Sequence, residues 1–286
     1  MSAPSAPLVR RERRGPVGLL TIDHPPVNVL SAEVLDALIE RLEDVRADPE
    51  VRAVVLAGAA PKAFAAGANI REMAGLGPTE ARAHGSKGQA ATLALERLPM
   101  PVIAAVHGVC LGGGCELALA CDFILASPEA TFGQPEVNLG VMPGWGGTQR
   151  LPRRIGAAQA RYWIYTGRAV SAADAHAQGL VLRITARERL LDDAIELGTE
   201  LAGKSADALA AAKYSVQFAI DRGMTRGLAF ELRRWEALFA TTDQKEGMRA
   251  FLDKRPWVPA PRDPGSATAA VGGTDPDPSA GGKRKN

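Results

Sequence analysis

Three short, almost uninterrupted apolar runs constrain the fold more than any other feature of the chain. Residues 51–57 read VRAVVLA, residues 102–106 read VIAAV and residues 123–126 read FILA. Strands that are apolar on both faces are typical of parallel sheets, because helices cover both sides of such a sheet. Since helical periodicity follows or precedes each run, the sequence predicts an α/β fold with right-handed crossover connections.

Helical periodicity is clearest in two parts of the chain. After a first strand at residues 17–22, Ser31 is a suitable N-cap for a helix with one apolar face. That face is formed by Val34, Leu35, Leu38, Leu42 and Val45. Beyond residue 187 strand signals are few, and the amphipathic stretches are residues 190–201, 206–220 and 225–239. We expect these stretches to form helices that pack on the core or on a neighbouring subunit.

Composition divides the chain into four segments. Residues 1–14 are small, Pro-rich and then basic, so we expect a mobile arm. Residues 15–200 contain the strand and helix signals of the α/β core, and residues 201–257 form a helical oligomerisation region. Residues 258–286 are rich in Pro, Gly, Ala, Ser and Thr, a composition typical of a disordered tail.

Charge and hydropathy exclude two classes of partner. A formal net charge of +2 and an aromatic content of 5% provide neither the field nor the stacking surfaces of a nucleic-acid-binding protein. The apolar stretch at residues 102–126 has the length of a membrane span, but His107, Glu116 and Asp122 interrupt it. We therefore expect no nucleic-acid and no membrane partner.

The three cysteines lie within a short segment. Cys110, Cys115 and Cys121 are surrounded by apolar residues, which favours buried, reduced thiols in a cytoplasmic protein. A zinc site needs more ligands at a different spacing, so we expect no metal.

A run of three glycines precedes the first candidate catalytic residue. Gly112, Gly113 and Gly114 lie between a predicted strand and a predicted helix, and Glu116 follows in the first turn of that helix. Free amides at a helix N-terminus can bind phosphate or stabilise an oxyanion. Tight strand–helix packing is the alternative explanation of the glycines, and helix capping is the alternative for Glu116.

A second carboxylate occurs twenty residues later, at Glu136 in the sequence GQPEV. A glycine-rich loop at residues 141–150 then leads into another helix. Two carboxylates beside a backbone-amide site are the groups that addition of water next to a carbonyl requires. One orients the water, the other moves a proton at the adjacent carbon, and the amides bind the enolate oxygen.

Together these motifs resemble the crotonase superfamily, and within it the enoyl-CoA hydratase branch. The resemblance covers residues 16 to 257. It rests on FAAGA at residues 64–68, PVIAAV at 101–106, the glycine- and alanine-rich residues 112–122, FGQPE at 132–136, and residues 240–248 and 250–255. It implies a spiral core of ββα turns followed by a helical trimerisation region, assembled as a homotrimer or homohexamer.

The resemblance also implies a role for individual residues. The amides of Ala68 and Gly113 would form the oxyanion hole, Glu116 would position and activate water, and Glu136 would protonate the α-carbon. The substrate would be an acyl-CoA thioester, with no further cofactor. Its CoA and acyl contacts would be Ala66, Ala68, Asn69, Ile70, Arg71, Gly113, Gly144, Phe251 and Lys254.

The sequence departs from the family pattern at two site positions. Asn69 replaces the usual aspartate after the oxyanion alanine, and Trp145 is bulkier than the usual residue of the glycine loop.

Two alternatives to hydration stay open. Isomerisation of an enoyl-CoA, or another crotonase-type reaction on a CoA thioester, is the alternative activity. A non-catalytic binding scaffold is the alternative class. The joint presence of Glu116 and Glu136 favours hydration over both.

Overall fold

A six-stranded sheet forms the centre of the molecule, of which the computed structural model describes residues 6–265. Strand β1 pairs antiparallel with β2, and every other pair of neighbours is parallel. In spatial order the strands are β1 (Val9–Arg14), β2 (Val17–Ile22), β4 (Ala53–Gly58), β7 (Val102–Val106), β9 (Phe123–Ala126) and β12 (Arg183–Ile184).

Two smaller sheets lie beyond the ends of these strands. The larger has the order β11 (Val170–Ser171), β10 (Thr131–Gly133), β8 (Val109–Leu111) and β5 (Ala63–Ala65). The other is the parallel pair β3 (Val29–Leu30) and β6 (Gly67–Ala68). Because β5, β6 and β8 follow strands of the central sheet, they lead the chain from the core to one edge of the molecule.

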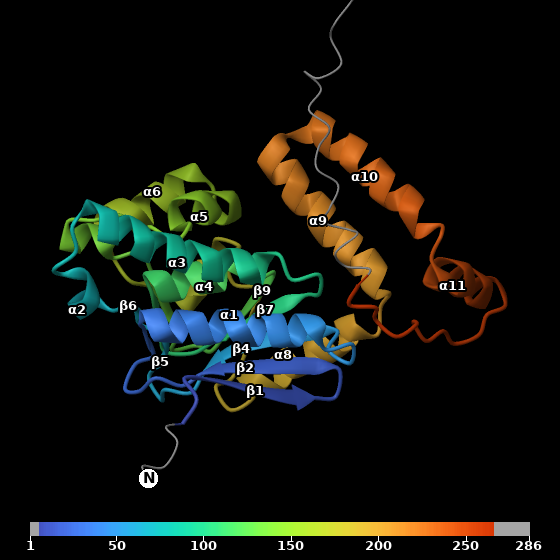
Figure 1. The fold of residues 1–286 in the computed structure, drawn as a ribbon, viewed down its shortest axis with the longest axis horizontal. Coiled ribbons are helices and arrows are strands. Elements are labelled where there is room, and N and C mark those ends of the chain that lie inside the picture. Colours follow the sequence, from blue (N-terminus) through green and yellow to red (C-terminus); the bar gives the residue numbers. More distant parts are fainter. Residues whose placement is uncertain (1–5, 266–286) are drawn as a thin grey trace, which may run out of the picture.

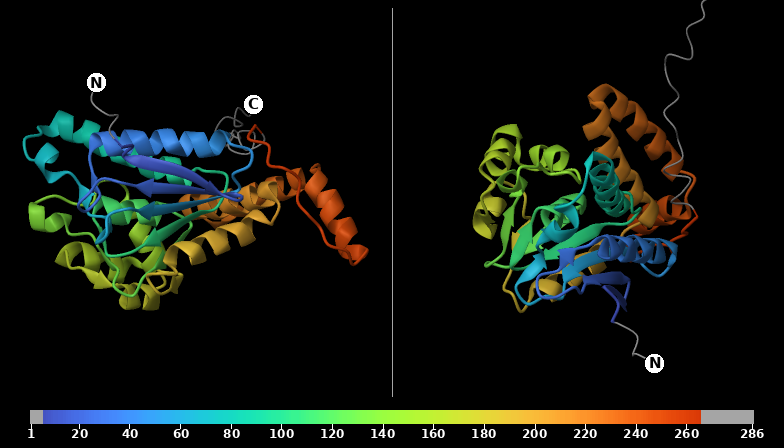
Figure 2. Two further views of the ribbon diagram at one scale, coloured as in Figure 1. Left: turned by 90° about the horizontal axis from the view of Figure 1, so that it is seen from below. Right: turned by 60° about the vertical axis from the view of Figure 1, so that its left-hand side comes forward.

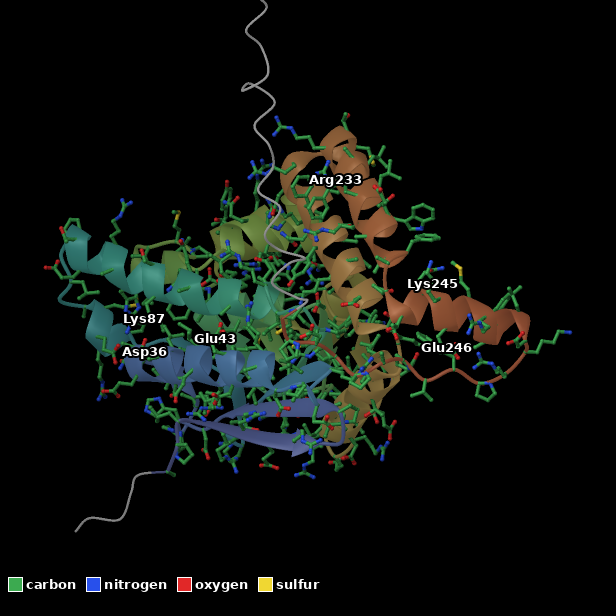
Figure 3. The ribbon with its side chains drawn as sticks, turned by 45° about the vertical axis from the view of Figure 1, so that its right-hand side comes forward. Asp36, Glu43, Lys87, Arg233, Lys245 and Glu246 are labelled. Atoms are coloured by element: carbon green, nitrogen blue, oxygen red, sulfur yellow. The ribbon has the colours of Figure 1, made fainter. Side chains whose placement is uncertain are left out.

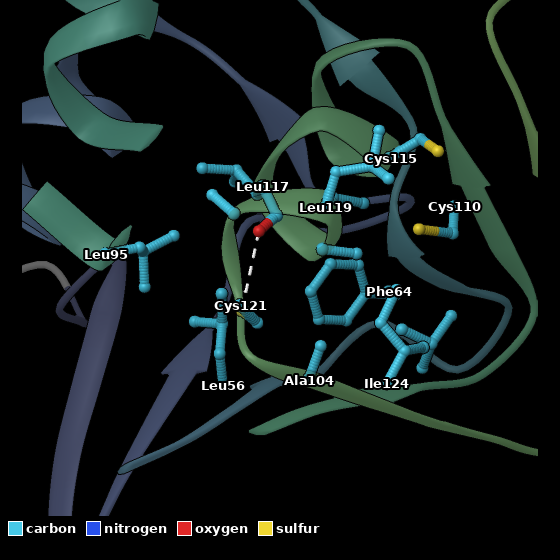
Figure 4. Packing of buried hydrophobic residues seen from close by; sticks show 14 of the residues in the cluster. Leu56, Phe64, Leu95, Ala104, Cys110, Cys115, Leu117, Leu119, Cys121 and Ile124 are labelled. Carbon is cyan, nitrogen blue, oxygen red and sulfur yellow. Dashed lines mark hydrogen bonds between the residues drawn. The ribbon is translucent and has the colours of Figure 1, made fainter. Parts of the chain in front are cut away.

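Helices cover both faces of the central sheet, which explains the apolar runs. Along β4, Val54 and Leu56 belong to the main core with α1 (Ala32–Ala47), α3 (Pro78–Glu96) and α4 (Gly113–Ala120). The alternate residues Ala53 and Val55 belong to a second core, which α8 (Leu190–Ala202) covers. Figure 4 shows part of the main core, in which Phe64, a fully buried residue, packs among the side chains of α4 and neighbouring strands.

The remaining helices surround the site and form a C-terminal arm. Between β6 and β12 they are α2 (Ile70–Met73), the 3-10 helix η1 (Glu136–Leu139), α5 (Gly147–Ile155), α6 (Ala157–Thr166) and α7 (Ala172–Ala177). The arm consists of α9 (Ala206–Arg222), α10 (Met224–Leu238) and α11 (Thr242–Leu252). The α9–α10 hairpin extends away from the sheet and α11 lies at the far side of the molecule from α2 (Figures 1 and 2).

Much of the predicted secondary structure is confirmed. The strands expected at residues 17–22, 102–106 and 123–126 have those bounds, and Ser31 caps α1 by accepting a hydrogen bond from the Val34 N–H. The five apolar residues expected on one face of α1 are all buried. Between α1 and α3, the ion pair of Asp36 with Lys87, at 2.7 Å, joins the two helices (Figure 3).

The N-terminal arm differs from expectation. Val9–Arg14, predicted to belong to a mobile arm, is strand β1 at the edge of the sheet. Val9 is buried while the charged residues after it are exposed, a pattern typical of protected edge strands. The composition of the segment hid this, because edge pairing uses backbone groups that carry no residue signature. Residues 1–5 lie outside the described residues.

The predicted disordered tail also differs where the structure describes it. Arg262 is only 6% exposed and its guanidinium donates to carbonyls at the C-terminal end of α1. The acceptors are the carbonyls of Val51 (2.8 Å), Val45 (3.5 Å), Arg46 (2.8 Å) and Asp48 (2.5 Å). A positive charge is favourable at a helix C-terminus. The hydrogen bonds of Arg262 therefore anchor this part of residues 258–265 to the core. Residues 266–286 lie outside the described residues.

We expect Arg262→Ala to lower the free energy of unfolding by about 2 kcal/mol, because it removes a charged donor from several buried carbonyls. Urea denaturation measures this loss. The matched control is Arg255→Ala, whose guanidinium forms ion pairs at the surface with Glu246 and Asp253. Surface pairs contribute less than about 1 kcal/mol, so equal losses in the two variants would contradict the anchoring role.

Candidate active site

The turn between β8 and α4 is the centre of the candidate site. Gly112 has φ +52°, a left-handed conformation that favours glycine, and its N–H donates to the Gly133 carbonyl at 3.0 Å. This bond places the end of β10, which leads to Glu136, beside the start of α4. Helix α4 begins at Gly113, so the N–H groups of its first turn have no acceptor within the helix.

Glu116 is held inside the protein by backbone amides. Its side chain is in the first turn of α4, and the residue is 2% exposed. Oε1 accepts from the N–H of Trp145 and from the N–H of Gly147, both at 2.7 Å. Burial raises the pKa of Glu116, whereas the hydrogen bonds from Gly147 and Trp145 and the positive charge of Arg150 oppose that rise. The carboxylate is therefore fixed in one position by the glycine loop.

Helix α3 in turn fixes the glycine loop. The Gly144 carbonyl accepts from Gln89, and the Trp145 carbonyl accepts from both Thr92 and Arg150, at 2.9 to 3.0 Å. Arg150 also pairs with Glu96 at the end of α3, with Nη2 2.8 Å from Oε2. These bonds join the loop to a rigid helix, so the amides that hold Glu116 are themselves held in place.

Glu136 faces the same turn from the other side. A Cβ atom added at Gly112 would lie 3.2 Å from its Oε1, and its Oε2 is buried without a hydrogen-bond partner. Burial and, to a smaller extent, the negative charge of Glu116 together raise the pKa of Glu136 from 4.5 to about 7. An acid with this pKa carries a proton in a large fraction of molecules near neutral pH, as a general acid must.

The strand β6 brings a second set of amides to the turn. A Cβ atom added at Gly67 would lie 3.0 Å from the Leu111 carbonyl and 3.5 Å from the Gly113 nitrogen. The backbone at Gly67–Ala68 therefore runs against the start of α4, and the predicted oxyanion residues Ala68 and Gly113 come together there. Two amides on different segments are the usual construction of an oxyanion hole.

The two explanations of the glycine run both apply. A Cβ atom at Gly114 would lie 2.2 Å from the Ala65 carbonyl, and one at Gly113 would lie 2.2 Å from the Trp145 ring. Tight packing therefore excludes side chains at these two positions. Gly112 is required for its backbone conformation and for the nearby carboxyl of Glu136.

The predicted CoA contacts separate into two groups. Ala66 lies between β5 and β6, Asn69 joins β6 to α2, and Ile70 and Arg71 begin α2, so all four flank the Gly67–Ala68 backbone. Asn69 is the N-cap of α2, accepting from the Arg71 N–H at 3.1 Å and donating to Glu72 at 2.7 Å. Thus the amide that replaces the family aspartate retains a structural role.

The second group does not lie near the site of its own chain. Phe251, in α11, is 82% exposed, and Lys254 follows that helix. Helix α11 and the β6–α2 segment lie at opposite sides of the molecule (Figure 1). Within one copy of the chain, Phe251 and Lys254 therefore lie apart from the other predicted CoA contacts.

Sequence reasoning did not find the groups that hold Glu116. They are the backbone N–H groups of Trp145 and Gly147, together with the α3 side chains Gln89 and Thr92 that fix the loop. A backbone amide has no residue signature, so only the glycines of the loop could have indicated it. The hydrogen bonds from α3 cross more than fifty residues of sequence and leave no periodic pattern.

Other site types find no support within residues 6–265. No group of three or more His, Cys, Asp or Glu side chains there could hold a metal ion. In the same part of the chain, no helix has the length and hydropathy needed to cross a membrane. Cys110, Cys115 and Cys121 are free and buried, as the sequence predicts.

Known proteins are similar to this chain in fold and sequence. A solved enoyl-CoA hydratase from Bacillus anthracis superposes with a TM-score of 0.84 at 37% identity, covering 88% of this chain and 98% of that one. A probable enoyl-CoA hydratase from Rhizobium meliloti is 48% identical, covering 85% of this chain and 94% of that protein. A short-chain-enoyl-CoA hydratase from Clostridium acetobutylicum is 39% identical with the same coverage.

The fold and the glycine turn with its two carboxylates define a member of the crotonase superfamily, as the resemblance implied. The family model for enoyl-CoA hydratase/isomerase matches residues 12–259. The chain belongs to the enoyl-CoA hydratase/isomerase family.

The raised pKa of Glu136 makes stability depend on pH. Because the folded protein binds this proton more tightly than the unfolded chain, stability falls as pH rises from 4.5 through about 7. We expect Glu136→Gln to be more stable than the parent above pH 7, by up to about 2 kcal/mol after allowance for partial solvent screening.

The advantage of Glu136→Gln should disappear below pH 4.5, where the parent residue is neutral as well. Urea denaturation at acidic and alkaline pH measures both limits. Glu43→Gln, an exposed change on α1, controls for replacement of a carboxylate by an amide. A stability difference that does not change with pH would show that Glu136 titrates normally.

Proposed function

We propose that the protein catalyses the reversible hydration of trans-2-enoyl-CoA to 3-hydroxyacyl-CoA. One observation carries this proposal: two buried carboxyl groups face one helix N-terminus, and only one of them is held by backbone amides. Glu116 accepts two amide hydrogen bonds, which favour its ionised form, while Glu136 has a buried, unpartnered oxygen and a pKa of about 7. Pairs of carboxyls separated in this way supply one base and one acid.

The proposed reaction uses each group once. The amides of Ala68 and Gly113 bind the thioester oxygen, on which negative charge develops. Glu116 orients a water molecule and receives its proton as the hydroxyl adds to the β-carbon. Glu136 donates its proton to the α-carbon as the enolate collapses. The two carboxyls share one proton before and after the reaction, so a proton exchange between them restores the starting state.

The substrate contacts follow from the edge of the site. We propose that Ala66, Asn69, Ile70 and Arg71 lie along the CoA arm, and that Gly144 borders the reacting end. A Cβ atom added at Gly144 would have the Met142 carbonyl, at 4.0 Å, as its only neighbour, which supports this placement. Phe251 and Lys254 would contact the CoA bound to a neighbouring copy, because α11 projects away from its own site.

No further cofactor enters this proposal. The two carboxyls carry out both proton movements and the amides bind the oxyanion, so CoA is needed only as part of the substrate. We also propose a cytoplasmic location. Three free, buried cysteines are typical of a protein that matures in a reducing compartment.

Hydration of crotonyl-CoA tests the activity directly. We expect loss of the enoyl-thioester absorbance and formation of the 3-hydroxyacyl product. Glu136→Gln should lower kcat by at least about 100-fold, the usual contribution of a general acid. Glu43→Gln is the matched control and should retain the parent rate.

Two results would contradict the proposal. Unchanged activity of Glu136→Gln would remove the general acid from the mechanism. A product with a shifted double bond and no incorporated water would show that the enzyme is an isomerase. Solvent labelled with oxygen-18 and mass analysis of the product separate hydration from isomerisation.

We further propose that the chain self-associates through the C-terminal arm, as a trimer or a hexamer. Large apolar side chains lie exposed along one arm: Val216, Ile220, Met224, Leu228, Leu232 and Trp235. Several exposed large apolar side chains on neighbouring helices are typical of an interface between subunits.

Leu232→Asp should shift the protein to a smaller species in light scattering coupled to size exclusion, because it places a charge within the apolar surface. Leu182→Asp introduces the same change at an exposed leucine outside the arm and should leave the assembly intact. If both variants retain the parent mass, the arm is not the interface. A monomeric parent would contradict the proposal outright.

A further inference from the structure

The indole of Trp145 occupies a closely fitted slot between two helices. The residue is 4% exposed. A Cβ atom added at Gly88 of α3 would lie 2.1 Å from the ring, and one added at Gly113 of α4 would lie 2.2 Å from it. Neither glycine has a positive φ that would explain its identity. Space for the indole is therefore what both positions require, and the ring fills the gap between α3 and α4.

The slot adjoins the reacting groups. Gly113 presents its Cα to the indole, while its amide is one of the two proposed oxyanion donors. The backbone N–H of Trp145, not its indole, donates to the Glu116 carboxylate at 2.7 Å. In the proposed reaction the thioester oxygen binds these amides, and the water held by Glu116 attacks the β-carbon. The alkyl tail of the substrate starts at that β-carbon. The start of that tail therefore lies close to the indole, which contacts Gly113.

The indole cannot move aside at low cost. The atoms nearest to the Gly88 position belong to the five-membered ring, and those nearest to the Gly113 position belong to the six-membered ring. Both ends of the side chain are thus in contact with backbone. His84 lies against the ring with a centroid distance of 5.9 Å, and the Thr92 hydroxyl holds the Trp145 carbonyl at 3.0 Å. Rotation of the ring would require α3 to shift.

We propose that Trp145 limits the length of the acyl chain, and that Gly88 is the residue that allows it to do so. The substrates are then short, unbranched enoyl thioesters such as crotonyl-CoA, whose tails end before the indole. Longer tails would clash with the ring, so the thioester could not bind the two amides in the reactive position. This inference rests on the proposed hydratase function and concerns only the size of the substrate.

The test is a comparison of kcat/KM for crotonyl-, hexenoyl-, octenoyl- and decenoyl-CoA. We expect the parent to lose efficiency as the chain lengthens. Trp145→Ala should raise the decenoyl-to-crotonyl ratio by at least about 10-fold, because one or two methylenes in an apolar pocket change kcat/KM by that factor or more. A ratio is used because the loop also holds Glu116, and a loss of rate common to all substrates cancels in it.

A second variant refills the slot from the opposite helix. In the Trp145→Ala background, Gly88→Leu points a side chain into the vacated volume, because the Cβ direction of Gly88 meets the ring position. We expect this double variant to return the ratio toward the parent value. Trp163→Phe changes a buried tryptophan of α6 that hydrogen-bonds to Gln178, and should leave the ratio unchanged. If Trp145→Ala does not fold, Trp145→Leu serves in its place.

The outcomes are distinct. Equal use of decenoyl- and crotonyl-CoA by the parent would overturn the proposal, and so would an unchanged ratio in the folded Trp145→Ala or Trp145→Leu protein. In both cases hydration of crotonyl-CoA continues, so the proposed function survives. Absence of hydration with every chain length would refute the function itself, and the inference would fall with it.

Discussion

The hydrogen bonds from two loop amides to the Glu116 carboxylate are the interaction on which the rest of the site depends. A buried carboxylate is costly unless its lone pairs are satisfied, and here Trp145 and Gly147 each donate at 2.7 Å. These two bonds connect α4, which carries the glutamate, to the loop before α5. Without them the buried carboxylate would destabilise the fold instead of being fixed beside the Gly112 turn.

Helix α3 extends this constraint to the outer layer of the fold. Its side chains Gln89 and Thr92 bind the loop carbonyls, and its Gly88 accommodates the Trp145 ring. A single helix therefore fixes the loop amides that hold Glu116 and contacts the indole beside them. The position of the Glu116 carboxylate and the packing between α3 and α4 are coupled, because Trp145 supplies both a backbone amide and an indole.

The two carboxyls illustrate how environment separates groups of the same chemistry. Glu116 is the more deeply buried of the two, and its amide donors oppose the rise in pKa that burial causes. Glu136 has a buried oxygen with no donor, and burial together with the nearby charge of Glu116 raises its pKa to about 7. Helix α11 of the C-terminal arm contacts neither carboxyl group of its own chain, because it lies on the far side of the molecule.

The sequence alone determined the central strands, the helix capped by Ser31, and Glu116 and Glu136 as candidate catalytic residues, because periodicity and short motifs are local. It failed for β1 and for the segment around Arg262, where backbone pairing and burial override a composition typical of mobile chain. It could not find the amides of Trp145 and Gly147 or the slot made by Gly88 and Gly113. Those depend on contacts between distant segments, and only the tertiary structure brings such segments within hydrogen-bonding and packing distance.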